Sequence, residues 1–466
     1  MVHHSTSEES SEEAQNVQPL GRLATLSYGV GHMLNDITSA CWFTYLLLFL
    51  TNMGLSPRLK MLWDAATVML SGQVADAFTT IFVGELIDRY GHFKLWHAGG
   101  SLLVAVSFSS VFGSCLPCKV MGSNSTTLQT IGYSTFAAIF NVGWAVTQVS
   151  HMSMVNCMTL NPTSRVSLAS CRNAFSMVAN LSLYAIALCV FSVYAKDYVD
   201  IKLQYSVVPV LSAVELYKFS MRLCVLFSSC RLKLQFECRK LSGISWTHWF
   251  KKILYYQVAL VYMLTRLVAN VSQALLASYV TKELGMGRSS KASVPAIIYI
   301  CSFLVSVVLQ EIRWSGLRLK IFFTAGAILW IFSGAGVFVL PGRMHNLMYP
   351  LSVIIGAANA LMMVTGISME SMLVGEDLNG SGFVYGSLSF VDKLSCGLAL
   401  YALESYQESS DPMQKLDNHI SYSVTRYGLG VIPATCALIS AAITYTMKLP
   451  DACSARSVTL VEPLLA

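Results

Sequence analysis

The sequence predicts an all-α membrane protein with twelve transmembrane helices in two six-helix halves. Hydrophobic residues make up 54% of the 466 residues and charged residues only 12%, whereas a soluble globular protein carries about 25% charged residues. An apolar run of about 20 residues is long enough to cross the hydrocarbon core of a bilayer. Twelve such runs fill the chain and leave no soluble domain, which indicates that the protein is not an enzyme and has the lipid bilayer as its surroundings.

The apolar runs form two sets of six on either side of a basic stretch. The first half is predicted at 25–228, with helices at 25–52, 61–87, 95–115, 128–156, 168–194 and 205–228. The second half is predicted at 253–447, with helices at 253–281, 293–311, 319–340, 346–374, 381–404 and 421–447. The basic stretch 229–252 is expected to be a cytosolic linker along the anionic membrane surface. Residues 1–24, acidic and Ser-rich, and 448–466 are expected to be cytosolic tails, the first of them disordered.

Loop charges predict the orientation of the chain. Lys and Arg are more numerous in the segments on the same side as the N-terminus, so the positive-inside rule places both ends in the cytosol. The net charge of +6 is then explained by loops facing an anionic leaflet, and no nucleic-acid partner is indicated. Asn124 in Asn124-Ser-Thr126 would lie on the luminal side and accept a glycan. Cys115 and Cys118 lie on the same side, where they could form a disulfide or remain two thiols at a helix end.

Polar and ionisable residues within the helices are the candidates for function. A charge at mid-depth costs about 2.5–3.5 kcal/mol on insertion scales, so such residues usually line a water-filled path. Both signs occur in both halves, which favours a polar or zwitterionic solute: bases could hold a carboxylate, and acids could hold an ammonium or accept a proton. The alternative is that some of them pair permanently between helices. The predicted cavity residues are Asp36, Tyr45, Asp76, Gln148, Arg172, Arg266, Asn270, Glu370 and Lys393.

The loop after the second predicted helix carries the most specific motif. Gly84, Asp88, Arg89, Gly91 and Lys94 have the spacing of the loop that joins helices 2 and 3 in major facilitator transporters, and the chain resembles that superfamily. The resemblance implies the major facilitator fold and a gating loop. A small residue allows two helices to approach, and Asp88 can cap the N-terminus of a neighbouring helix. Arg89 and Lys94 would hold the turn in the cytosol.

A narrower resemblance covers nearly the whole chain. The stretches Asp76-Ala-Phe-Thr-Thr-Ile-Phe-Val-Gly84 and Asp88-Arg-Tyr-Gly-His-Phe-Lys-Leu-Trp96 resemble the glycoside–pentoside–hexuronide:cation symporter branch of the superfamily. Gly31-His-Met-Leu-Asn-Asp36 is similar to the segment that supplies a sugar-binding aspartate in that branch. Arg172 and Lys393 stand where the branch has bases. The chain departs from the branch at Thr80, where the branch has a second aspartate, so the resemblance gives little support to a sodium site and leaves proton coupling open.

The resemblance also implies a solute and a place in the cell. Within the branch, the chain is most similar to lysosomal and melanosomal membrane proteins that move cysteine into the organelle, with consequences for cystine content and pigmentation. The plasma membrane is the alternative location. The alternative functions are a cation-coupled sugar or nucleoside symporter and a transport-inactive membrane scaffold or subunit. We expect a monomer and no bound cofactor.

Overall fold

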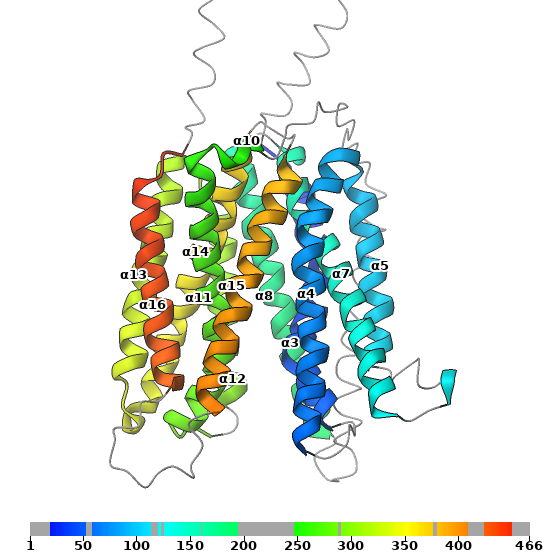
Figure 1. Cartoon of the computed structure of the whole chain (residues 1–466). Helices are drawn as coiled ribbons and strands as arrows, with labels where there is room; N and C mark the ends of the chain where they lie inside the picture. Colours follow the sequence, from blue (N-terminus) through cyan, green and yellow to red (C-terminus); the bar gives the residue numbers. More distant parts are fainter. Residues whose placement is uncertain are drawn as a thin grey trace, which may run out of the picture.

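The computed structural model describes residues 19–52, 58–112, 120–122, 125–159, 161–193, 247–287, 290–375, 380–408 and 424–449. Nearly all of these residues are helical, and no strand occurs within these ranges (Figure 1). A helix suits a bilayer because it satisfies its own backbone hydrogen bonds where no water is present. The predicted sixth helix at 205–228, most of the linker at 229–252, Asn124, Cys115, Cys118 and most of both tails lie outside the described residues.

The first half contains the helices predicted as the first to the fifth. They are α2 (Arg22–Gly31) and α3 (Met33–Asn52), α4 (Arg58–Tyr90), α5 (Phe93–Phe112), α7 (Thr126–Met158) and α8 (Pro162–Val193). The run expected as a single helix at 25–52 is divided at His32, whose backbone leaves the regular helix between α2 and α3. Divided helices are a known way of placing polar groups inside a transporter.

The second half contains the six predicted helices and three short additional elements. They are α11 (Ile253–Ser278), α12 (Ser290–Leu309), α13 (Gly316–Val339), α14 (Met348–Val374), α15 (Ser381–Glu408) and α16 (Val424–Thr446). The short helix α10 (Thr247–Phe250) precedes them, the π-helix η2 (Tyr279–Glu283) extends α11, and the 3₁₀ helix η3 (Gly342–Leu347) precedes α14. Among the described segments, six are long and apolar enough to span a membrane: 93–112, 253–281, 316–339, 342–374, 381–400 and 425–446.

Local sequence explains where several helices begin and end. Asn161 precedes Pro162, the first residue of α8, and its side-chain oxygen accepts a hydrogen bond from the Ser164 N–H at 3.2 Å; Asn as N-cap followed by Pro is a favoured helix start. Ser315 caps α13 by accepting from the Arg318 N–H. After α4, Gly91 adopts a positive φ of 66°, which costs glycine little and allows the short turn into α5.

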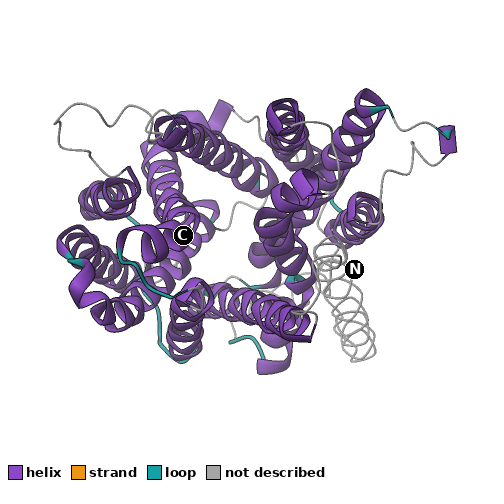
Figure 2. Ribbon diagram, turned by 90° about the horizontal axis from the view of Figure 1, so that it is seen from below, coloured by secondary structure: helices purple, strands orange, loops and turns teal. Residues whose placement is uncertain are grey.

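The two halves lie side by side and meet along two sets of helices. In Figure 1 the first half, from blue to cyan, lies on the right and the second half, from green to red, on the left. The helix pairs in contact across the boundary include α4 with α15, α8 with α12 and α8 with α14. α4 and α15 converge toward the end of the bundle that carries α10, which the positive-inside rule predicts to be cytosolic (Figure 1). Figure 2 shows the same helices from below, so that many are seen nearly end-on.

Glycines allow α4 and α15 to touch backbone to backbone. A Cβ on Gly84 would lie 3.3 Å from the Phe383 Cα and still closer to the Gly382 backbone, and a Cβ on Gly386 would overlap the Thr80 carbonyl. Larger residues here would push the helices apart. This is the close approach expected from the small residue in the loop motif.

Candidate solute path and gate

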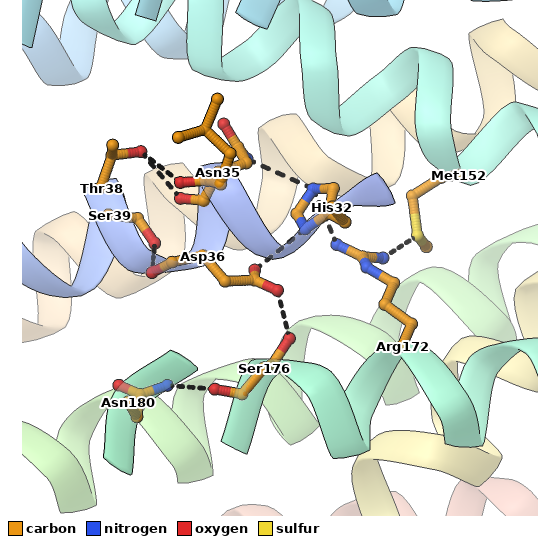
Figure 3. A network of polar contacts seen from close by, with 10 residues as sticks. His32, Asn35, Asp36, Thr38, Ser39, Met152, Arg172, Ser176 and Asn180 are labelled. Atoms are coloured by element: carbon orange, nitrogen blue, oxygen red, sulfur yellow. Dashed lines mark hydrogen bonds and ion pairs between the residues drawn. The ribbon is translucent and has the colours of Figure 1, made fainter. Parts of the chain in front are cut away.

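Asp36 lies at the centre of a polar network in the first half (Figure 3). Its Oδ1 is 2.9 Å from the Nδ1 of His32, and its Oδ2 accepts a hydrogen bond from the Ser176 hydroxyl at 2.5 Å. Arg172 of α8 lies beside this pair: its Nη2 is 3.4 Å from the Nε2 of His32, and its Nη1 contacts the Met152 sulfur. A carboxylate and a guanidinium are thus held close together by α3 and α8.

Asp76 and Lys393 form an ion pair that joins the two halves. Asp76 is on α4 and Lys393 on α15, and their side chains are 2% and 7% exposed. The Lys393 ammonium also lies 4.6 Å from the centre of the Trp144 ring, a cation–π contact with α7. Thr80, one turn after Asp76, donates its hydroxyl hydrogen bonds to the backbone carbonyls of Asp76 and Ala77. The buried Asp76–Lys393 pair is therefore in contact with the Trp144 ring, and the position one turn after Asp76 holds a threonine in place of a second carboxylate.

A second ion pair lies within the second half. The Arg266 Nε of α11 donates to the Asp392 Oδ2 of α15 at 3.0 Å. The Cys396 thiol donates to the other oxygen of Asp392 at 3.2 Å, and Asn270 donates to the Cys396 sulfur at 3.1 Å. Asp392 and Lys393 are adjacent in sequence and point to different partners, so each of these two charges is paired in this conformation.

Glu370 connects these groups electrostatically. It is 1% exposed on α14, and its Oε1 has no hydrogen-bond partner among the described residues. It interacts through space with Arg172 of the first half and with Arg266 and Asp392 of the second. Lys393 interacts in the same way with Asp392 and Arg266. The charges predicted from sequence therefore form one linked set across the boundary between the halves.

The remaining predicted cavity residues are placed as follows. Gln148 of α7 is 7% exposed and its Oε1 is without a partner in the described part of the chain. Asn270 belongs to the group around Asp392. Tyr45 lies on α3, but its side chain is outside the described residues. Between them, the described ranges contain no group of three or more His, Cys, Asp and Glu side chains arranged to hold a metal ion.

Asp88 closes the α10 end of the boundary by capping a helix of the other half. Its Oδ1 accepts a hydrogen bond from the Gly382 N–H at 2.7 Å, and its Oδ2 accepts one from the Phe383 N–H at 2.6 Å. These N–H groups belong to the first turn of α15, where helix backbone donors lack partners and a negative charge is stabilised by the helix dipole. Arg89 and Lys94 are exposed at the same end.

Arg165 makes a second connection at this end. It is 3% exposed near the start of α8, and its guanidinium donates to the carbonyls of Thr159, Ser371 and Gly375 at 2.9, 3.0 and 2.7 Å. The last two acceptors end α14, so a cation here satisfies carbonyls at the negative end of that helix. The two halves are thus joined by the Asp88 carboxylate at the start of α15 and by the Arg165 guanidinium at the end of α14.

Sequence reasoning missed Arg165 and His32. Arg165 was overlooked because it sits near a helix end, where a basic residue is ordinarily assigned to the membrane surface. Its signal was the segment Asn161-Pro-Thr-Ser-Arg165, which starts a helix directly after another ends. His32 was quoted only as part of the segment leading to Asp36, although it is the residue that positions that carboxylate.

The fold and this arrangement define a membrane transport protein of the major facilitator type, with charges from two helical halves facing one another and helix caps joining the halves at one end. The chain belongs to the family described as MFS/sugar transport protein, whose model matches residues 27–451. It is therefore a member of a transporter family and not of an enzyme family.

Comparisons of this chain with known proteins, in sequence and in structure, agree with this family assignment. The chain is 33% identical over 423 residues to "Major facilitator superfamily domain-containing protein 12" of Homo sapiens, covering 84% of this chain and 86% of the human protein. The protein of the same name from Mus musculus is 31% identical over 422 residues, with coverage of 83% and 85%. Among solved structures, the proton:xylose symporter XylE has a TM-score of 0.65 at 13% identity, covering 92% of this chain and 96% of that one. An outward-facing bacterial homologue of the iron transporter ferroportin also has a TM-score of 0.65, at 12% identity, covering 91% and 99%. At these identities the two structures bear on the fold alone.

Proposed function

We propose that this protein is a secondary transporter that works by alternating access and imports cysteine from the cytosol into lysosomes or melanosomes. In such a transporter the two halves rock around a site at mid-membrane. The proposal rests on one observation above all. Glu370, a buried carboxylate with an oxygen that lacks a partner among the described residues, lies within electrostatic range of Arg172 in the other half.

These two residues suit the two ends of an α-amino acid. Arg172 presents a guanidinium, the side chain best matched to a carboxylate. Glu370 presents an oxygen that an ammonium group could use, because it makes no hydrogen bond within the described residues. A solute held in this way would connect α8 with α14 at a second point, in addition to the hydrogen bonds that Arg165 makes with the end of α14. The two opposite charges favour a zwitterion, and the resemblance of the sequence implies cysteine within that class.

Uptake of labelled L-cysteine tests the proposal. Lysosomes from cells with this chain should accumulate more of the label than lysosomes from cells without it. Glu370→Gln should reduce uptake at least about tenfold, because a neutral amide loses the charge that attracts the ammonium. Glu311→Gln is the matched control, since Glu311 is exposed and pairs only weakly with Arg22 at 3.6 Å. Equal uptake with and without the chain would reject cysteine import.

A sugar symporter is the second candidate. It is favoured by the description of the matching family, which includes sugar transport, and by the presence of Asp36 in a segment resembling one that supplies a sugar-binding aspartate. A sugar would use the hydrogen-bonding capacity of Asp36 and Gln148 and would not need Arg172. Competition separates the two candidates: excess xylose or melibiose should leave labelled-cysteine uptake unchanged if the solute is an amino acid.

A further inference from the structure

Tyr385 lies beside Glu370 where α15 meets α14 and the first half. It is 3% exposed and belongs to the second turn of α15. The charged group that acts most strongly on its hydroxyl is Glu370 of α14. Arg165, Tyr28 and Cys157 of the first half are also within electrostatic range. The Tyr385 hydroxyl is therefore a polar group at the same boundary as the Glu370 carboxylate.

Ser389 lies one turn further along the same face of α15. It is 4% exposed, and residues four apart in a helix are neighbours on its surface. Asp392, seven residues after Tyr385, returns to this face because seven residues make nearly two turns. Glu370 interacts electrostatically with both Tyr385 and Asp392. Since Ser389 lies between those two residues along the helix, it faces α14 at the level of Glu370.

Three buried oxygens at this point make no hydrogen bond within the described residues: the Tyr385 and Ser389 hydroxyls and the Oε1 of Glu370. Tyr385, Ser389 and Glu370 together form the oxygen cluster. Buried polar groups nearly always have a partner, and an exception calls for an explanation such as a bound water, an ion or a function. Ser387 and Ser395 of the same helix donate to carbonyls of α15, so the Ser389 hydroxyl differs from them in being left without a partner.

The donors that approach the oxygen cluster from the first half are engaged elsewhere. The Arg165 guanidinium donates to three backbone carbonyls. The Tyr28 hydroxyl donates to the His151 carbonyl at 3.2 Å. The oxygen cluster is therefore complementary to a group that brings its own N–H or O–H donors and, because of Glu370, a positive charge.

We propose that Tyr385 and Ser389 complete an ammonium subsite of which Glu370 is the charged member. This inference rests on the proposed transport function and deepens it, because it restricts the solutes to primary amines. A primary ammonium has three N–H donors and no acceptor, and the oxygen cluster offers one acceptor to each donor. A carboxylate would be repelled by Glu370 at this position, so the carboxylate of the solute turns to Arg172 and its ammonium to the oxygen cluster.

A subsite of this kind distinguishes solutes by their number of N–H groups. Methylation of the solute nitrogen removes one donor and keeps the positive charge, so the attraction to Glu370 remains and one buried oxygen stays without a partner. A buried oxygen left in this way costs the desolvation of that group. N-Methyl-L-cysteine should therefore compete at least about tenfold more weakly than L-cysteine.

Competition for the uptake of labelled L-cysteine measures this discrimination in proteoliposomes that contain the purified full chain. The measured quantity is the ratio of the concentrations of N-methyl-L-cysteine and of L-cysteine that halve the uptake. We expect a ratio of at least about ten in the natural chain and below about three in Tyr385→Phe, where two N–H groups meet two oxygens. Ser389→Ala removes the other hydroxyl and repeats the test if Tyr385→Phe does not fold.

Tyr255→Phe is the matched control. The Tyr255 hydroxyl is also buried and donates to the Ser387 hydroxyl of α15 at 2.8 Å. Its loss weakens the packing of the same helix and leaves the number of oxygens in the cluster unchanged. Tyr255→Phe should therefore keep the ratio of the natural chain, even where it lowers thermal stability.

The outcomes separate this inference from the proposed function. A ratio near one in the natural chain would overturn the ammonium subsite and leave cysteine transport standing. A natural ratio that persists in both Tyr385→Phe and Ser389→Ala would do the same, because loss of either oxygen must remove the discrimination. Equal uptake of L-cysteine by proteoliposomes with and without the chain would overturn the proposed solute, and this inference with it.

Discussion

Replacing Asp88 with alanine should open the α10 end of the boundary between the halves. The carboxylate accepts two hydrogen bonds, at 2.7 and 2.6 Å, from N–H groups in the first turn of α15. Alanine removes both acceptors and the negative charge at the helix start. When the halves separate in the natural protein, water replaces the carboxylate at these N–H groups, so the variant loses stability in the closed arrangement only.

The size of the effect follows from these contacts. A hydrogen bond to a charged group contributes about 1.5–3 kcal/mol to stability. Both bonds share one carboxylate that is only partly buried, so their contributions do not add fully, and about 2–3 kcal/mol is a reasonable total. Since 1.4 kcal/mol is a factor of ten in an equilibrium constant, the ratio of open to closed arrangements should rise about 25- to 150-fold.

Labelling of a cysteine placed at Thr80 measures this ratio. Thr80 is fully buried between α4 and α15, so Thr80→Cys should react with a membrane-impermeant maleimide only when the α10 end opens. The rate, corrected for the same chain without Thr80→Cys, should increase at least about tenfold when Asp88→Ala is added. Glu85→Ala is the matched control, because it removes a carboxylate from an exposed position on the same helix. Equal labelling rates for the two alanine variants would refute the capping argument.

Two other connections lead to predictions of their own. Arg165→Lys should lower the free energy of unfolding by about 2–4 kcal/mol and slow uptake, because an ammonium cannot reach three carbonyls in the fork geometry of a guanidinium; thermal unfolding measures this, and Arg313→Lys at an exposed position should have no such effect. Asp76→Asn should lower the free energy of unfolding by about 3–5 kcal/mol, because it leaves the Lys393 charge buried without its partner. Adding Lys393→Gln should restore most of that free energy, and a double variant no more stable than Asp76→Asn alone would contradict the pairing.

Much of the fold could be predicted from sequence because each helix is encoded locally. Length and hydrophobicity give the spans that the described residues contain, and the main departure, the division at His32, comes directly after Gly29 and Gly31. Glycine weakens a helix, and two glycines within three residues were a signal for a break. The division into two six-helix halves with a linker at 229–252 stays a prediction, since residues 194–246 are outside the described ranges.

The site was less predictable because its contacts join distant positions. Their positions inside apolar helices singled out Asp36, Asp76 and Lys393 as charges that need a polar partner. The partners could not be assigned, because the ion pair between Asp76 and Lys393 joins residues 317 positions apart. Nothing in a single sequence states which acid meets which base. Asp88 was the exception, because the spacing of its loop is recognisable and a carboxylate at a turn has an obvious use at a helix start.

The α4–α15 contact combines two interactions of different character. Asp88 and its two N–H donors lie near the end of the bundle, whereas the Asp76–Lys393 pair lies twelve residues deeper along α4, about 18 Å at 1.5 Å per residue. Water can replace a cap at the surface, but separating a buried ion pair leaves two charges without compensation. Rocking of the halves should therefore break the cap and keep the pair as the pivot. Asp88→Ala should then speed labelling of the cysteine at position 80 with little loss of thermal stability. Asp76→Asn should lower the thermal stability with little change in the labelling rate. Equal effects of both variants on both measurements would show that the two contacts open together.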